Sequence, residues 1–144
     1  MRTFTLEEAE ELLPTLESLL RSAIEARAQA EPIEQELGQQ MRRIHLAGGA
    51  MVDVAAVAGK RRLLSDLVRR IKDAVEEIDA IGVQVKDLNR GLLDFPSELD
   101  GEVVLLCWEL GEPQIGYWHS LEGGYASRKP LDGRFGKEHP DKLN

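Results

Sequence analysis

Cysteine is nearly absent from this chain of 144 residues, and the single one, Cys107, excludes an internal disulfide. Only seven residues are aromatic, and five of those lie between Phe95 and Tyr125, so the first two thirds must pack with aliphatic side chains. No apolar run approaches the roughly 18 residues of a membrane span. The N-terminal residues become acidic at once, unlike a secretion signal. We therefore expect a soluble cytoplasmic protein.

An excess of basic residues is also missing, because 18 Lys and Arg stand against 26 Asp and Glu, for a formal net charge of -8. Proteins that bind DNA or RNA usually present a basic face to the phosphates. The only basic stretch is residues 128–144, with five Lys or Arg against three Asp or Glu. Nucleic acid is thus not an expected partner, and without a basic amphipathic helix neither is an anionic membrane.

Two long segments do carry a strong pattern, with apolar residues at alternating steps of three and four. The first stripe, interrupted only by the polar Gln40, is Leu16, Leu19, Ala23, Ala26, Ala30, Ile33, Leu37 and Ile44. The second stripe is Leu64, Leu67, Ile71, Ala74, Ile78, Ile81, Val85, Leu88 and Leu92. This spacing is typical of helices that pack on one another. It predicts an antiparallel helical hairpin, and the three alanines predict a close approach.

Capping residues and prolines set the expected helix bounds. Thr5 followed by Glu8 forms a capping box, so a helix should begin at Leu6. Pro14 lacks the N–H of a helix interior and predicts a break or sharp kink. We expect a short helix over residues 6–13 and hairpin helices over residues 14–46 and 53–90, the first of them with a further bend at Pro32.

Strand-like alternation replaces the helical period after Gly91. The runs LLDFPSEL, EVVLLCWEL and QIGYWHS are separated by Asp100-Gly101 and by LGEP, which predicts a three-stranded antiparallel meander over residues 92–120. The predicted fold class is therefore α+β, with one domain over residues 1–131 and an extended or loosely ordered tail over residues 132–144.

If both turns of the meander are two-residue loops, alternation assigns each side chain to a face. One face would hold Leu93, Phe95, Val104, Leu106, Trp108, Ile115, Tyr117 and His119. The other would hold Asp94, Val103, Leu105, Cys107, Glu109, Gly116 and Trp118. Both faces are apolar enough to need cover. The hairpin alone would also leave apolar flanks exposed, namely Leu20, Ile24, Leu63, Val68 and Val75. We therefore expect a homodimer or other oligomer built through the helices.

Several joined motifs point to a known family. They are Asp94-Phe95-Pro96, Leu106-Cys107-Trp108, Leu110-Gly111-Glu112-Pro113, Tyr117-Trp118-His119, Gly124-Tyr125-Ala126, the run from Arg128 to Leu131, and the opening TLEEAEELLP. Together they resemble the bacterial family of uncharacterised proteins called domain of unknown function 2203. The resemblance implies helices followed by a small β region. It implies no established activity, and it brings no catalytic residues.

Binding of a divalent metal ion is the most specific chemical hypothesis that the sequence supports. His119 and Glu122 are three residues apart, and Glu109, Glu112 and Asp94 lie on neighbouring predicted strands or turns. Imidazole and carboxylates together can hold a transition metal. The spacing matches no established metal motif, however, and the predicted faces turn His119 away from Asp94 and Glu109. A hydrogen-bonded structural histidine is the competing interpretation.

Other chemistry has less support in the sequence. Cys107 and His119 fall on opposite predicted faces, which argues against a thiolate–imidazole nucleophile. Trp118, Tyr125 and Arg128 could contact an anionic ligand or a partner, although a solvated basic loop explains them as well. The sequence thus favours a non-enzymatic interaction or scaffold protein that assembles through its hairpin. The alternative is a protein that binds a metal or small molecule around His119, in which case it could be an enzyme.

Overall fold

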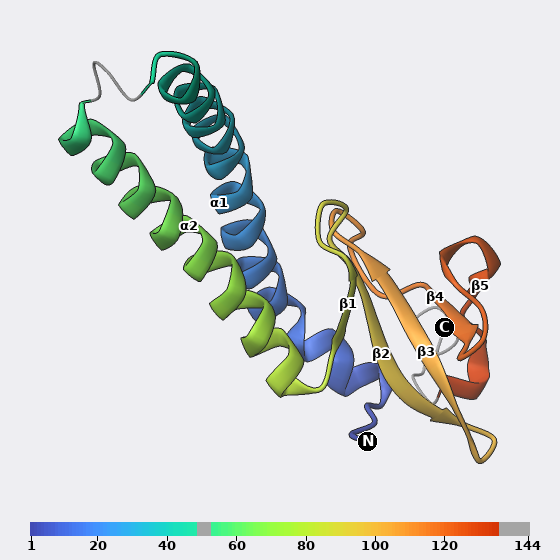
Figure 1. Ribbon diagram of the computed structural model, residues 1–144. Helices are drawn as coiled ribbons and strands as arrows, with labels where there is room; N and C mark the ends of the chain where they lie inside the picture. The colour runs from blue at the N-terminus through green and yellow to red at the C-terminus, as the bar shows by residue number, and fades with distance from the viewer. Residues whose placement is uncertain (49–52, 136–144) are drawn as a thin grey trace.

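A long helical arm with a small β-sheet at its base makes up the computed structural model, which describes residues 1–48 and 53–135 (Figure 1). Helices α1 (Leu6–Leu46) and α2 (Val54–Ile81) form the arm. The sheet has the order β1-β2-β3-β4-β5, with every neighbouring pair antiparallel. Its strands are β1 (Gln84–Asp87), β2 (Leu92–Leu99), β3 (Glu102–Glu109), β4 (Tyr117–Ser120) and β5 (Lys129–Pro130). The α+β class and the meander are confirmed, but the meander has five strands instead of three.

Helix α1 begins at Leu6 and ends at Leu46, both as predicted, but it is one helix where two were expected. The Thr5 hydroxyl accepts a hydrogen bond from the Glu8 N–H at 3.1 Å, and Glu8 Oε1 accepts one from the Thr5 N–H at 2.8 Å. The helix continues without a break through both Pro14 and Pro32, so the break expected between residues 13 and 14 is wrong, whereas the predicted alternative of a bend there is compatible with this continuity. Pro14 is exposed, and one lost hydrogen bond bends a helix without ending it. Figure 1 shows the first turns of α1 lying across the sheet, at an angle to the arm.

Helix α2 ends eight or nine residues earlier than predicted. Gly82 adopts the left-handed conformation, with φ of 105°, and its N–H bonds back to the Asp79 and Ile78 carbonyls. The chain then pairs with β2 as strand β1, with Val85 opposite Leu93. The heptad pattern continues past Ile81 because a residue such as Val85 would be apolar in a helix or in a strand. In the structure the Val85 side chain packs against the main core and not in the helix seam.

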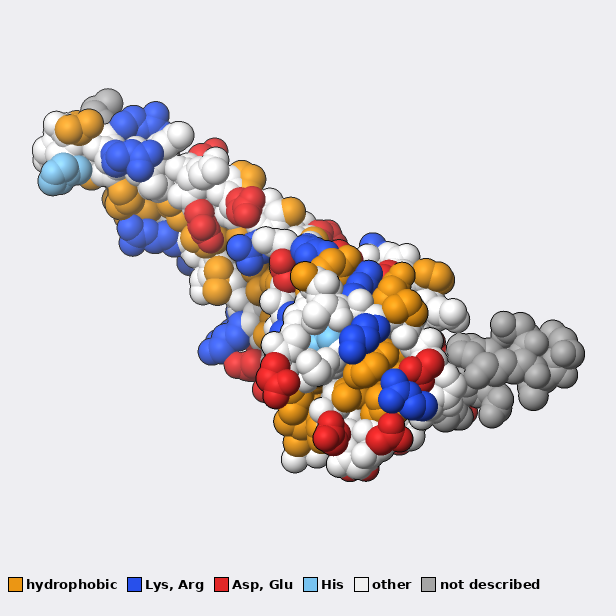
Figure 2. Space-filling model, turned by 90° about the vertical axis from the view of Figure 1, so that its right-hand side faces the viewer, with side chains coloured by type: hydrophobic (Ala, Val, Ile, Leu, Met, Phe, Trp, Pro, Cys, Tyr) orange, Lys and Arg blue, Asp and Glu red, His pale blue; other side chains and the backbone are white. Residues whose placement is uncertain are grey.

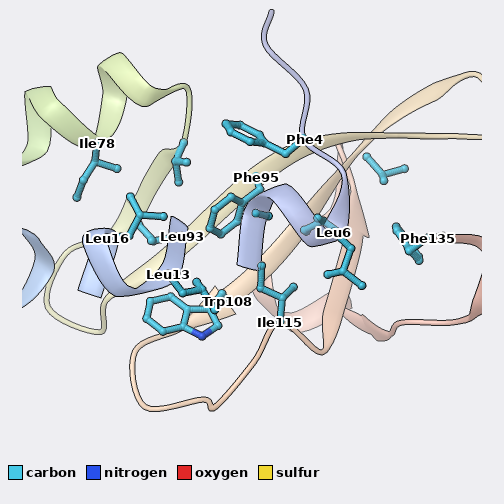
Figure 3. Packing of buried hydrophobic residues seen from close by; sticks show 14 of the residues in the cluster. Phe4, Leu6, Leu13, Leu16, Ile78, Leu93, Phe95, Trp108, Ile115 and Phe135 are labelled. Carbon is cyan, nitrogen blue, oxygen red and sulfur yellow. The ribbon is translucent and has the colours of Figure 1, made fainter. Parts of the chain in front are cut away.

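The main core lies between the base of the arm and one face of the sheet (Figure 3). Leu13 and Leu16 come from α1, Ile78 from α2, and Phe95 and Trp108 from the sheet. Leu20, expected on an exposed flank, is instead fully buried here. Farther along the arm the contacts are smaller, since Ala26, Ala30 and Leu67 form a separate buried cluster. All three seam alanines, Ala23, Ala26 and Ala30, are at most 3% exposed, as expected for residues that lie in a helix seam.

Part of the predicted tail belongs to this core. Residues 133–135 form a short 3-10 turn, and Phe135 is buried, with its ring 5.6 Å from that of Trp118. The rest of the predicted tail, with His139, lies outside the described residues, as do residues 49–52 of the hairpin loop.

The predicted faces hold for β2 and β3 and fail for β4. Leu93 pairs with Trp108 and Phe95 with Leu106, as alternation requires. The connection from β3 to β4 is not a two-residue loop, because it spans residues 110–116. The register therefore slips by one position, and His119 lies opposite Leu105. A slip of one residue moves every side chain of a strand to the other face, so His119 shares the face that is turned away from the helices.

Candidate functional site

Three buried side chains converge on the sheet face that is turned away from the helices. Asp94 lies on β2, Cys107 on β3 directly opposite it, and His119 on β4. One ligand atom from each lies within 4.8 Å of the others, and none of the three residues is more than 2% exposed. We call these three residues the strand cluster. Among residues 1–48 and 53–135 it is the only such group of His, Cys, Asp or Glu.

The imidazole of His119 is oriented at both nitrogens. Nδ1 lies 2.8 Å from the Ser120 carbonyl oxygen, which can only accept, so Nδ1 carries a proton and donates it. Nε2 lies 3.1 and 3.2 Å from the two carboxylate oxygens of Asp94. The Nε2 atom and a carboxylate oxygen can form a hydrogen bond only when a proton lies between them. His119 and Asp94 therefore share one proton at this contact. The atom that faces the cluster, Nε2, is the one that could bind a metal.

Cys107 is a buried, protonated thiol. Burial, followed by the neighbouring Asp94 carboxylate, raises the pKa of this thiol to about 11. Arg128 opposes this rise, since its Nη1 lies 4.0 Å from the Cys107 sulfur. A buried, protonated thiol is a poor nucleophile. The predicted separation of Cys107 and His119 onto opposite faces is wrong, yet the burial and high pKa still disfavour nucleophilic catalysis.

Arg128 borders the strand cluster and is held on several sides. Its guanidinium makes two hydrogen bonds to the Glu112 carboxylate, at 3.3 and 3.0 Å. The same group lies 3.9 Å from the ring centre of Tyr117 and 4.3 Å from that of Tyr125. Such planar stacking and bidentate pairing fix an arginine in place. The Arg128 guanidinium therefore packs beside the strand cluster, and its contacts with Glu112, Tyr117 and Tyr125 already occupy the groups that would bind an anion.

The family model described as "Uncharacterized conserved protein (DUF2203)" matches residues 2–131. The chain belongs to the DUF2203 family. The match covers the arm, all five strands and the whole strand cluster, and it confirms the resemblance seen in the sequence. No curated protein and no solved structure matches the chain significantly.

The metal ligands expected from the sequence are only partly brought together in this DUF2203 fold. His119 lies in the strand cluster, whereas Glu109 accepts hydrogen bonds from Arg90 and Tyr125, each at 3.0 Å. The Arg90 contact, and then that of Tyr125, lowers the pKa of Glu109. Glu112 is engaged by Arg128, and Glu122 is exposed.

The residues expected to contact a ligand are divided between the two sides of the sheet. Tyr125 and Arg128 adjoin each other beside the strand cluster. Trp118 lies on the other side, packed against the helix-side core. Sequence reasoning missed Cys107 as a partner of His119. A usable signal was present, since the glycines and proline of residues 110–116 fit a longer loop better than a two-residue turn.

No helix within residues 1–48 and 53–135 is long and apolar enough to cross a membrane.

Proposed function

We propose that this DUF2203 protein binds one divalent transition metal ion, with zinc as the best fit, through Asp94, Cys107 and His119. The observation that carries the proposal is the convergence of a carboxylate, a thiol and an oriented imidazole within 4.8 Å in a buried site. Zinc accepts this mixture of oxygen, sulfur and nitrogen ligands. The hydrogen bond from His119 Nδ1 to a backbone carbonyl matches the support that metal-binding histidines usually have.

Charge balance favours exchange of a metal for protons at this site. Without metal, the protonated thiol and the proton shared by His119 and Asp94 leave the strand cluster neutral. A divalent ion that displaces both protons leaves a thiolate, a carboxylate and a neutral imidazole around two positive charges. The cluster then remains neutral, which avoids placing an uncompensated charge in a buried environment.

The distances also suit this exchange. Tetrahedral zinc with bonds of about 2.0–2.3 Å places its ligand atoms about 3.5 Å apart. Asp94 and His119 are already at 3.1 Å, and the widest separation in the cluster is within 4.8 Å. A contraction of about 1 Å is within the reach of side-chain rotation. The three residues would leave one coordination position for water or another small ligand.

The burial of the site argues for metal binding without catalysis. With no cluster residue more than 2% exposed, the ion would be enclosed by protein side chains and would not be open to a large substrate. We therefore propose a role for the metal in tying together β2, β3 and β4, and we propose no reaction.

Cobalt substitution tests the proposal directly. The protein, stripped of metal and titrated with Co²⁺, should bind about one ion per chain and develop the near-ultraviolet absorption of a cobalt–thiolate bond. Cys107→Ser should abolish that band, because the chain has no other cysteine. His119→Gln should weaken both cobalt and zinc binding by at least about 100-fold. Zinc binding is measured by competition with a chromogenic chelator.

Two exposed residues provide matched controls. Glu122→Gln removes a nearby carboxylate that lies outside the strand cluster, and His45→Gln removes an exposed histidine near the end of α1. Neither should change the cobalt spectrum or the zinc affinity. Absence of the thiolate band in the wild-type protein, or its survival in Cys107→Ser, would refute the proposal.

We also propose that the chain assembles through its arm as an oligomeric interaction protein. The supporting observation is that Val68, an apolar residue on α2, is 47% exposed. Full burial of one such side chain is worth about 1.5–3 kcal/mol. Light scattering should give at least twice the chain mass of 16.1 kDa. A monomer at every concentration tested would contradict this second proposal.

A further inference from the structure

The apolar surface of helix α2 extends beyond the residues that are buried against α1. The buried positions of α2 are Leu67, Ala74 and Ile78. Next to them run four residues at steps of four, three and four, which are Leu64, Val68, Ile71 and Val75. Val68 is 47% exposed, and the other three are partly buried. Leu64 and Ile71 use part of their surface to pack against the cluster of Ala26, Ala30 and Leu67 and leave the rest accessible. The stripe is about 17 Å long, and we call it the outer stripe.

The spacing of the outer stripe is the same when it is read in either direction. Leu64 and Val75 lie equally far from the midpoint between residues 69 and 70, and so do Val68 and Ile71. A second copy of α2 running antiparallel would therefore set Leu64 against the partner's Val75 and Val68 against the partner's Ile71. A two-fold symmetric interface needs a self-complementary surface of this kind.

Opposite charges lie at the two ends of the same stripe. Arg61 is three residues before Leu64, and Asp79 is four residues after Val75, and both are exposed. More generally, Lys and Arg side chains gather toward the far end of the arm, as Figure 2 shows. On α2 the basic run Lys60, Arg61 and Arg62 lies toward the far end of the arm, whereas Asp73, Glu76, Glu77 and Asp79 lie toward the sheet.

These charges select the direction of packing. In a parallel pair, Arg61 would lie beside the same arginine of the partner, and Asp79 beside the same aspartate. In an antiparallel pair, Arg61 lies within half a turn of the partner's Asp79, and symmetry provides this contact twice. Complementary charge at an interface favours one orientation and disfavours the other.

We infer that two copies of this chain associate through antiparallel α2 helices along the outer stripe, with Arg61 of each copy beside the partner's Asp79. This inference rests on the second proposed function, assembly through the arm, and gives that assembly a partner, a surface and a direction. It places the two sheets at opposite ends of the dimer.

The apolar part of the inference is tested with a matched pair of variants in the full chain. Val68→Glu should weaken dimerisation more than about 10-fold, as measured by light scattering or analytical ultracentrifugation across a concentration series. Leu63→Glu is the control, because Leu63 is equally exposed on α2 but lies outside the outer stripe. It should leave the dimer intact, and circular dichroism should show that both variants keep their helices.

The direction is tested by exchanging the charges. Arg61→Glu and Asp79→Arg should each weaken the dimer roughly 10-fold, since each sets like charges together at both ends. The double variant R61E/D79R should restore wild-type affinity, which only an antiparallel pairing predicts. A dimer disrupted by Leu63→Glu but not by Val68→Glu, or a double variant weaker than both single ones, overturns the inference and leaves assembly standing. A strictly monomeric wild-type protein overturns both.

Discussion

Replacing Asp94 with asparagine separates metal binding from simple ion pairing at the strand cluster. Asparagine keeps the size of the side chain and removes its charge. Its amide can donate a hydrogen bond to Nε2 of His119, while Nδ1 continues to donate to the Ser120 carbonyl. Alanine at the same position leaves Nε2 with no partner on that side. The two substitutions therefore affect the metal-free fold differently.

The expected losses of stability follow from the burial of Asp94 and His119, each of which is 2% exposed. Loss of one partner from a buried pair costs about 3–5 kcal/mol, which we expect for Asp94→Ala. Asp94→Asn should cost about 1 kcal/mol, because the hydrogen bond is replaced. With metal bound, however, the asparagine site would hold one uncompensated positive charge, and we expect the affinity to fall at least about 100-fold. Zinc at about 100 times the wild-type Kd stabilises the wild type by about 2.7 kcal/mol, and this falls to about 0.4 kcal/mol in the variant.

Urea unfolding followed by tryptophan fluorescence provides the assay, with chelator or with buffered zinc. Trp108 is 2% exposed and reports loss of the core. If Asp94→Asn lowers the metal-free stability as much as Asp94→Ala, the pair is needed as an ion pair and the argument for metal weakens. If Asp94→Asn keeps the full zinc stabilisation, the carboxylate is not a ligand.

Four further outcomes are expected. Zinc binding should release roughly two protons per ion, measured by calorimetry in buffers of different ionisation enthalpy, because the strand cluster stays neutral. Zinc should slow amide exchange in β4 more than in β2, since β4 is a short strand near the edge of the sheet. Gly82→Ala should destabilise the fold by about 1–2 kcal/mol in urea, because φ is 105° there and an added Cβ would lie 3.2 Å from the Arg2 side chain. The backbone hydrogen bond from Thr5 lowers the pKa of Glu8. The stabilisation of the fold by ionised Glu8 is therefore fully present above the usual pKa of a glutamate and is lost as the pH falls through the lowered pKa. The difference in unfolding free energy between the wild type and Glu8→Gln should close over that acidic range.

The arm could be predicted from the sequence because its signals are local. The capping box at Thr5 and the two stripes depend on residues within a few turns, and the structure follows them. The end of α2 could not be placed as well, because Val85 fits a helical stripe and a strand equally. Pairing with Leu93, a contact with a strand later in the chain, decides between the two.

Prediction of the site from the sequence depends on a single loop, the connection between β3 and β4. Asp94 and Cys107 were assigned to one face correctly, since the Asp100-Gly101 turn fixes the register between β2 and β3. The loop over residues 110–116 offers no such two-residue rule. Taking it as a tight turn placed His119 on the wrong face and separated the three residues that the fold brings together. A register error of one residue changes nothing in the fold class and everything in the chemistry.

Strand β3 links the two sides of the molecule. Leu106 and Trp108 point into the core against the helices, while Cys107 between them points into the strand cluster. The helix-side core fixes β3 whether or not a metal is bound. Strand β4 has four residues and pairs with β3 at four positions, followed by only two pairs to β5, so its side of the sheet is the less firmly held. An ion bound by Asp94, Cys107 and His119 would join this short strand to the two that the helices already secure. That placement is the structural reason why the role we propose for a metal at this site is to stabilise the sheet.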